Sequence, residues 1–210
     1  MNKKQIELIE KNFNIEVTEK INSDIDVWLQ YFNDYNSHTN LISKGDLKNI
    51  FEKHIFDSLA LVKYLDLNKN YKIIDVGTGG GFPSVILAIF FRNLEIIAVD
   101  SVGKKINFIK EIKEKLNLKN LDAINDRIEN LKIENVDFIV SRAVGRILKI
   151  YDFSKKHLNK NSKTIFYKSA NYEDEVIEFK TKYNKKIETV SYILPTDEQH
   201  QRRLIIISEN

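Results

Sequence analysis

The run IIDVGTGGGF, residues 73–82, constrains this chain more than any other segment. Residues suited to a buried strand lead straight into a glycine cluster, and Pro83 then opens the apolar segment SVILAIFF. This order predicts a strand, a tight loop and the start of a helix. Because glycines let the backbone approach a ligand where a side chain would block it, we expect this loop to bind a ligand.

The spacing of the glycines narrows the class of ligand. A dinucleotide-binding loop needs G-x-G-x-x-G/A, but the third position is Phe82 when counted from Gly77 and Ser84 when counted from Gly79. A Walker loop needs Gly-Lys-Ser/Thr after its glycines, and this sequence has none there. The pattern D-x-G-x-G-x-G does fit, at Asp75, Gly77, Gly79 and Gly81.

The second predicted strand, EIIAVD, ends in Asp100. A carboxylate at this place accepts hydrogen bonds from a ribose diol and disfavours a phosphate by charge repulsion. S-adenosylmethionine carries a ribose and no phosphate, so we expect it to be the ligand. A structural alternative is that Asp100 or Ser101 only caps the following helix.

Composition bounds the remaining classes of protein. The 210 residues, 42% of them hydrophobic, allow one domain or one domain with an extension. The absence of cysteine excludes a disulfide scaffold and a cysteine-based zinc site, and four histidines without H-E-x-x-H predict no metal site. No apolar run is long enough to cross a membrane and no secretory signal is evident, so we expect a cytoplasmic protein. The net charge of +3 permits an anionic partner without requiring one.

Residues 1–70 have the apolar spacing of helices and predict an N-terminal helical extension. Thr18 is placed to cap the second helix, 36–46 should be a loop, and a helix should resume over 50–61. Residues 71–210 should form one compact unit in which strands and helices alternate, which predicts a doubly wound α/β sheet. The expected strands are 72–76, 95–99, 121–124, 136–141 and 164–167, and the expected helices are 83–91, 103–117, 145–159 and 171–182. Two further strands, 187–194 and 202–208, have no helix between them and predict an antiparallel pair.

Two more groups of candidate residues follow from this layout. Ile128 and Glu129 come after the third strand, where an adenine would lie, and Arg142 directly follows the apolar fourth strand. Arg142 is placed to pair with Glu129, with Asp75 or with a cofactor carboxylate, or to form a purely structural ion pair.

The N-terminal segment adds His54, Asp57 and Ser58, which share one helix face. One helix turn cannot place a nucleophile and its base correctly, so we reject a hydrolase triad. A structural alternative is that these residues dock the helical part onto the sheet.

Taken together, the segments YNSHTNLIS, KHIFDSL, IIDVGTGGGFPS, VDSVGKK, NDRIENL and VSRAV resemble, in order and spacing, the bacterial 16S rRNA 7-methylguanosine methyltransferases, also called the glucose-inhibited division protein B family. The resemblance covers residues 36–143 and, less clearly, the rest of the chain. It implies a class I S-adenosylmethionine-dependent methyltransferase fold. This is a Rossmann-like doubly wound sheet whose last two strands are antiparallel. The expected reaction is methylation of guanine N7 in 16S rRNA of the small ribosomal subunit, carried out by a monomer.

The resemblance also assigns residues to roles. It implies that the cofactor is held at Gly77, Phe82, Ile128, Glu129 and Arg142, and the glycine pattern and the expected ribose contact add Gly79 and Asp100 to this site. Lys168, which the family also has, is a candidate for contact with the RNA or the guanine, and we expect Asp57 and His54 to help position the substrate. The family usually has Lys-Gly where this chain has Lys168-Ser169, and serine adopts fewer conformations than glycine. Further candidates for RNA contact are Lys104, Lys105, Arg146, Arg202 and Arg203.

Guanine N7 has an in-plane lone pair and no proton, so its methylation needs no general base and depends mainly on positioning. A carboxylate, for which Asp57 and Asp75 are candidates, would stabilise the positive charge that reaches the base. The alternatives are a methyltransferase of the same fold with another acceptor, or a non-catalytic RNA-binding protein with a vestigial cofactor pocket. A nicotinamide oxidoreductase is disfavoured by the missing third glycine.

Overall fold

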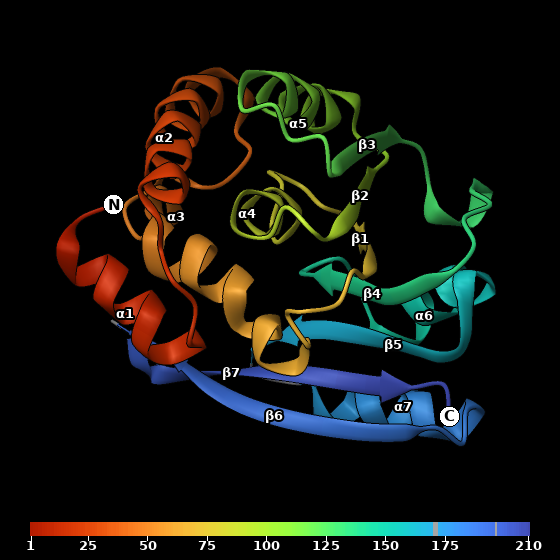
Figure 1. Cartoon of the computed structure of the whole chain (residues 1–210). Helices are drawn as coiled ribbons and strands as arrows, with labels where there is room; N and C mark the ends of the chain where they lie inside the picture. Colours follow the sequence, from red (N-terminus) through yellow and green to blue (C-terminus); the bar gives the residue numbers. More distant parts are fainter. Residues whose placement is uncertain (170–171, 196) are drawn as a thin grey trace.

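Five parallel strands form the greater part of the sheet in the computed structural model, which describes residues 1–169, 172–195 and 197–210 (Figure 1). They are β1 (Lys72–Val76), β2 (Glu95–Asp100), β3 (Leu121–Asn125), β4 (Val136–Arg142) and β5 (Leu158–Lys168). Each sits where the sequence predicts a strand, and β5 begins six residues earlier than the predicted 164. The first part of β5 extends the pairing with β4, since Leu158 lies opposite Val136 across a register shift.

The last two strands, β6 (Lys186–Leu194) and β7 (Asp197–Ser208), form the predicted antiparallel pair. β7 also pairs antiparallel with β5, so the strand order is β3-β2-β1-β4-β5-β7-β6. β7 begins before the predicted residue 202 because its first residues pair with β6, for example Gln201 with Ile193. Residue 196, within the predicted connection, lies outside the described residues.

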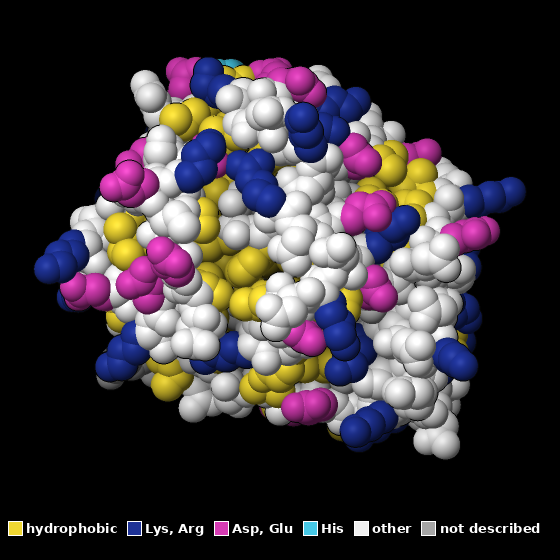
Figure 2. Space-filling view, in the orientation of Figure 1, with side chains coloured by type: hydrophobic (Ala, Val, Ile, Leu, Met, Phe, Trp, Pro, Cys, Tyr) yellow, Lys and Arg dark blue, Asp and Glu magenta, His cyan; other side chains and the backbone are white. Residues whose placement is uncertain are grey.

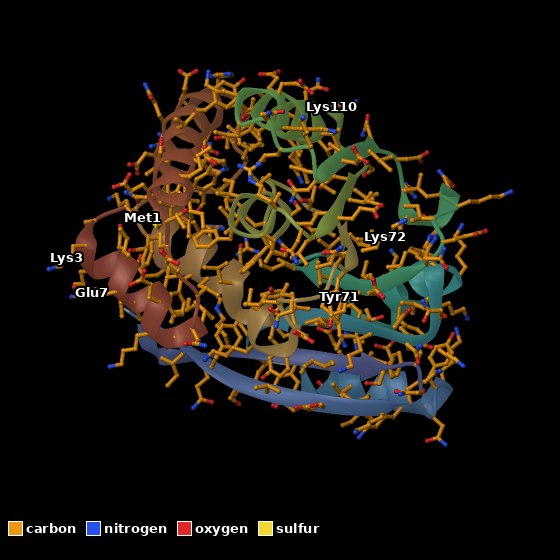
Figure 3. The ribbon with its side chains drawn as sticks, viewed as in Figure 1. Met1, Lys3, Glu7, Tyr71, Lys72 and Lys110 are labelled. Carbon is orange, nitrogen blue, oxygen red and sulfur yellow. The ribbon has the colours of Figure 1, made fainter. Side chains whose placement is uncertain are left out.

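The strand order reverses between β1 and β4, which lie side by side although two strands separate them in the sequence. Ligands of such sheets bind outside the carboxyl ends of the strands at this switch point. The glycine loop, Gly77–Phe82, follows β1, and Arg142 ends β4. Tyr71 and Lys72, labelled in Figure 3, mark the opposite, amino end of β1. The topology therefore brings the glycine loop and Arg142 to one edge of the sheet.

Helices cover both faces of the sheet, and neighbouring residues of one strand belong to different cores. Ile73 packs with α4 (Ser84–Phe90), α5 (Gly103–Lys115) and the N-terminal helices, whereas Ile74 packs with α6 (Ile147–Ser154) and α7 (Glu173–Lys182). This alternation is the period-2 pattern of a strand buried on both faces. The predicted helix 145–159 ends at Ser154, followed by the 3₁₀ turn η4 (Lys155–His157). Buried His157 lies within hydrogen-bond distance of the carbonyls of Ile133 and Ile128, which fixes the chain before β5.

The N-terminal segment consists of α1 (Lys3–Phe13), α2 (Glu19–Thr39), α3 (Lys44–Leu47), the π-helical turn η1 (Phe51–Phe56) and the 3₁₀ turn η2 (Leu59–Tyr64). Thr18 caps α2 as predicted, since its hydroxyl oxygen accepts from the Ile21 amide at 3.2 Å. The helices pack against α4 and the glycine loop (Figure 1): the rings of Trp28 and Phe32 lie 5.7 and 5.5 Å from that of Phe82. The proposed boundary near residue 70 between two units stays a prediction.

The predicted loop 36–46 is wrong in part. α2 continues to Thr39, and α3 occupies most of the second half. Buried Asn36 accounts for the turn between them, because its side-chain oxygen accepts a hydrogen bond from the Ile42 amide at 2.9 Å. Asn40 ends α2 in the left-handed conformation, which asparagine tolerates.

Candidate functional site

Gly77 gives the glycine loop its close approach to the end of β4. Its φ is +71°, and a Cβ at this place would lie 2.4 Å from a methyl group of Val144. The amides of Gly77 and Thr78 both donate to the Val99 carbonyl, at 2.8 and 3.1 Å, and so tie the loop to β2. Only glycine meets both the dihedral and the steric requirement here.

Gly79 and Gly81 serve different purposes in the same loop. Gly79 has a φ of +60° but open space around the position of a Cβ, whereas a Cβ on Gly81 would lie 2.4 Å from Val85. Gly79 also donates its amide to Asp100 Oδ2 at 3.0 Å. The loop is therefore folded by backbone contacts with its neighbours, which leaves its outer face available to a ligand.

Asp75 lies beneath the loop and supports it from inside. Its side chain is fully buried, and Oδ2 accepts from the Ser84 amide at 3.2 Å at the start of α4. Burial raises the pKa of Asp75 to about 6. The carboxyl group lines neither of the two cavities described below. Asp75 therefore supports the loop and does not lie beside a reacting base.

Asp100 joins the ends of β1 and β2. Besides Gly79, its carboxylate accepts from the Val102 amide at 2.9 Å, and Lys105 Nζ lies 3.5 Å away. The amino end of α5 has no side-chain cap hydrogen bond. Neither Asp100 nor Ser101 accepts from an amide inside α5, so the helix-capping alternative is wrong in its simple form. The Asp100 carboxylate instead joins the glycine loop to Val102, the residue before α5.

A cavity of about 490 Å³, here called the Asp100 cavity, opens between the ends of β1, β2 and β4. Ile128, almost fully buried, and Glu129 line it from the short turn η3 (Ile128–Asn130). The structure thus brings the predicted pair Ile128 and Glu129 into the same cavity as Asp100 and Gly77. Its other lining residues include Val76, Val99, Ser101, Val102, Asp126, Arg127, Lys149, Ile150 and Phe153.

A second cavity of about 380 Å³, here called the His54 cavity, lies between the N-terminal helices and the glycine loop. The predicted residues His54, Asp57, Phe82 and Arg142 all line it, together with Leu41, Ile42, Asp46, Lys53, Thr78, Gly79, Gly80 and Arg202. The two cavities share Gly77, Lys105, Ala143 and Val144. They therefore adjoin where the glycine loop meets the segment after β4.

Arg142 is the centre of a buried polar cluster. Its Nη1 donates to Asp57 Oδ2 at 3.0 Å and to the Lys53 carbonyl at 2.9 Å, and its Nη2 lies 2.7 Å from His54 Nδ1. The guanidinium also lies over the ring of Phe82, 5.0 Å from its centroid. The expected pairing of Arg142 with Glu129 or Asp75 is wrong, because the N-terminal helices bring Asp57 to it first.

Tyr192 completes this group, although no motif or spacing in the sequence pointed to it. The hydroxyl donates to Asp57 Oδ1 at 2.6 Å, so both carboxylate oxygens of Asp57 are engaged. Burial raises the pKa of Tyr192 well above its ordinary value, which keeps the hydroxyl protonated as a donor. We call Arg142, His54, Asp57 and Tyr192 the Arg142 cluster. Its members come from β4, η1 and the residue after it, and β6.

The electrostatics of the cluster keep His54 neutral. Burial, and then the neighbouring positive charge of Arg142, lower the pKa of His54 to about 3. The Asp57 carboxylate balances the guanidinium, and only 3% of the Asp57 side chain is exposed. The cluster therefore carries little net charge into the cavity.

Residues 54–58 also attach the N-terminal helices to the sheet, as the structural alternative expected. Ser58 donates to the His54 carbonyl at 2.6 Å, and Tyr167 of β5 donates to the Ser58 carbonyl at 3.1 Å. The polar face of this segment thus joins the N-terminal helices to the sheet while it also lines the His54 cavity.

Lys168 lies apart from both cavities. Its Nζ donates to the Gly145 carbonyl at 2.9 Å and pairs with Glu175 at 2.8 Å, with both side chains largely buried. The predicted contact of Lys168 with a base would require these bonds to break. Lys168 instead holds the segment that follows Arg142. Arg146 pairs with Glu178, and Lys104 donates to the Thr39 carbonyl, whereas Lys105 and Arg202 do line the His54 cavity.

No helix of the described residues is both long and apolar enough to cross a bilayer. The described residues also contain no group of three or more histidine, aspartate or glutamate side chains placed to hold a metal ion.

Comparisons with known proteins agree with this geometry. The chain is 41% identical, over 73% of its length and 75% of the relative, to the ribosomal RNA small subunit methyltransferase G of Francisella tularensis subsp. novicida. Its fold is similar to those of a SAM-dependent methyltransferase from Aquifex aeolicus and a methyltransferase from Pyrococcus furiosus. The first has a TM-score of 0.60 and 17% identity over 83% of this chain and 98% of that one. The second has a TM-score of 0.61 and 16% identity over 74% of this chain and 83% of that one. The family model for rRNA small subunit methyltransferase G matches residues 21–205, and the chain therefore belongs to that family.

Proposed function

We propose that this protein transfers a methyl group from S-adenosylmethionine to N7 of a guanine in 16S rRNA. The observation that carries the proposal is the pair of adjoining cavities at the switch point of the sheet, in a chain of this family. A two-substrate transfer needs one place for the donor and one for the acceptor, with a shared boundary where the methyl group crosses. The boundary here is the segment around Gly77 and Val144.

The Asp100 cavity fits the nucleoside part of the donor. At about 490 Å³ it falls within the usual range of small-molecule sites. Asp100 uses one lone pair on each oxygen for a backbone amide, and a carboxylate has about four such sites, so acceptors remain for two ribose hydroxyls. Buried Ile128 offers an apolar surface to an adenine. When bound, the donor supplies an electrophilic methyl group on a sulfonium.

The His54 cavity fits the acceptor base. Its wall combines the ring of Phe82 with the polar groups of His54, Asp57 and Arg142. None of these is needed as a base, since N7 has no proton to lose. The residues therefore act by holding the purine in line with the methyl group, which supplies most of the rate enhancement that such a transfer requires. Asp57 has both oxygens engaged, so any help it gives to the positive charge on the base is offset by Arg142.

The visible surface is not a uniformly basic groove (Figure 2). Lys and Arg side chains are interspersed with Asp and Glu over the face seen in Figure 2. Lys53, Lys105 and Arg202 line the His54 cavity and supply positive charge close to the base. We place the protein in the cytoplasm, acting as a monomer on 16S rRNA or on the small ribosomal subunit.

Mapping of 7-methylguanosine in rRNA tests the proposal directly. Cells that lack this protein should lose one 7-methylguanosine from 16S rRNA, and the purified protein with S-adenosylmethionine should restore it on their 30S subunits or their 16S rRNA. An unchanged methylation pattern would refute the proposed acceptor. Calorimetry with S-adenosylmethionine separates the vestigial-pocket alternative, which predicts no binding.

A further inference from the structure

His54 has a hydrogen-bonding state that the cluster fixes. Arginine cannot accept a hydrogen bond, so the 2.7 Å contact means that Arg142 donates and His54 Nδ1 accepts. The ring is neutral, because burial and the charge of Arg142 lower the pKa of His54 to about 3. A neutral imidazole whose Nδ1 accepts must carry its proton on Nε2. The cluster thus locks His54 as an Nε2–H donor.

That donor has no acceptor in the folded chain. Nε2 is buried and makes no hydrogen bond with any described residue, and the whole of His54 is only 8% exposed. A buried N–H without an acceptor destabilises a fold, so most such groups in proteins are paired. The ring is held in place by Phe82, whose centroid is 4.5 Å away, and by Arg142. His54 lines the His54 cavity, although Nε2 itself is buried in the folded chain. A ligand that enters the cavity can bring the missing acceptor once the ring turns enough to expose Nε2.

The two purines differ in what they present beside N7. Guanine has the acceptor O6 next to N7, whereas adenine has the donor N6–H₂ at the same place. A fixed N–H donor therefore forms a hydrogen bond with O6 of guanine. Beside adenine, the same N–H would face the N6–H₂ donor and form no hydrogen bond. A contact at O6 also leaves the lone pair of N7 free to attack, which a contact at N7 itself would not.

We propose that His54 is a specificity-determining residue whose Nε2–H donates to O6 of the guanine that is methylated. Arg142 acts as a positioning residue in this arrangement, since its hydrogen bond to Nδ1 keeps the proton on Nε2. The inference rests on the proposed function, because it needs a purine in the His54 cavity. It adds a reason for the choice of guanine over adenine.

Single-atom changes in the base test this contact. The substrate is 16S rRNA whose target guanine, once mapped, is replaced by 2-aminopurine, which lacks O6, or by hypoxanthine, which keeps O6 and lacks the 2-amino group. With the wild-type protein, we expect transfer to 2-aminopurine to be roughly 10- to 100-fold slower than to guanine, the discrimination that one good base contact provides. Transfer to hypoxanthine should stay within about threefold of guanine.

Combining a His54 variant with the base analogues tests whether His54 and O6 act together. His54→Phe should slow transfer to guanine by a similar factor and should slow transfer to 2-aminopurine no further, because the contact is already lost. His54→Gln, whose amide can donate, should recover part of the preference for guanine. The matched control is His38→Phe, at an exposed histidine of the same segment, which should keep the wild-type preference. A cooperative urea unfolding transition would show that the variants remain folded.

The outcomes separate the contact from the function. Equal rates on guanine and 2-aminopurine with the wild-type protein would overturn the contact while the methyltransferase function stands. The same holds if His54→Phe kept the full preference for O6. Absence of transfer to unmodified 16S rRNA would overturn the proposed function and this inference with it. If His54→Phe failed to fold, the wild-type rates on the two base analogues would still decide the matter.

Discussion

The glycine loop and the Arg142 cluster face each other at the same edge of the sheet, yet they are built in opposite ways. The loop is one stretch of chain, and its shape follows from glycine dihedrals and short backbone hydrogen bonds. The cluster is assembled from residues 54–57, residue 142 and residue 192, and its members hold one another by side-chain hydrogen bonds. The wall formed by the glycine loop therefore depends on residues close together in the sequence. The wall formed by the Arg142 cluster exists only in the complete fold.

The strongest test of the assembled wall is Arg142→Met. The change leaves the Asp57 carboxylate buried without its charge partner. Loss of one partner of such a pair typically costs about 3–5 kcal/mol of unfolding free energy. Urea denaturation measures the loss, and methyl transfer to 16S rRNA should slow because Arg142 lines the His54 cavity proposed for the acceptor base. Arg146→Met, at a more exposed ion pair with Glu178, should change stability by only about 0–1 kcal/mol. Equal losses of unfolding free energy in the two variants would show that the Arg142 cluster is no more important for the fold than an exposed ion pair.

The local wall is tested by two glycines that both have positive φ. Alanine at either place costs about 1–2 kcal/mol in the left-handed conformation. Gly77→Ala also forces a Cβ into Val144 and should cost about 1–3 kcal/mol more, whereas Gly79→Ala meets open space. Denaturant unfolding measures both. The double change Gly77→Ala with Val144→Ala should recover most of the additional loss, and no recovery would mean that the contact with Val144 is unimportant.

Asp75, which lies beneath the glycine loop, should make the stability of the protein depend on pH. Burial raises the pKa of Asp75 from 3.8 to about 6. The protonated form therefore favours the folded state, and this contribution is complete below pH 3.8 and is lost as the pH rises through about 6. A rise of the pKa from 3.8 to about 6 corresponds to roughly 3 kcal/mol.

Asp75→Asn does not titrate, so the stability of the wild-type protein relative to this variant should fall by that amount between about pH 4 and pH 7. The control is exposed Asp126, whose pKa is lowered by a hydrogen bond from Asn130. Asp126→Asn should give a small change of the opposite sign. A flat difference for Asp75→Asn would show that its carboxyl group is less buried than described.

The smallest expected effect concerns the far end of the cluster. Tyr192→Phe removes one hydrogen bond to a buried carboxylate, which is worth about 1.5–3 kcal/mol. Since Asp57 then loses part of its alignment with Arg142, the rate of methyl transfer to 16S rRNA should fall with stability. Tyr64→Phe is the control. Tyr64 and Tyr192 line one surface cavity between η2 and β6, and the Tyr64 hydroxyl makes no hydrogen bond within the described residues. If Tyr192→Phe lowered stability but left the rate of transfer to 16S rRNA unchanged, the cluster would have a structural role alone.

Most of the sheet could be predicted because its signals are local. A buried strand such as Ile73–Val76 and a run such as GTGGG carry their conformation in their own residues. The errors fall where a contact from elsewhere decides the structure. Asn36 turns the chain before α3, and pairing with β4 and β6 lengthens β5 and β7 beyond what their apolar runs suggest. Asp100, Ile128 and Glu129 were predictable as one site, because the ends of parallel strands must meet at one edge.

What the sequence by itself determined is the α/β sheet with its glycine loop and the cavity beside Asp100, since glycine dihedrals, strand periodicity and strand ends are properties of neighbouring residues. The family resemblance then supplied the reaction that we propose. Only the tertiary structure decided which partner Arg142 takes, that Tyr192 belongs to the site and that Lys168 stands outside it. The physical reason is that a buried charge pairs with whichever opposite charge the fold brings within hydrogen-bond distance, and sequence spacing does not set that distance.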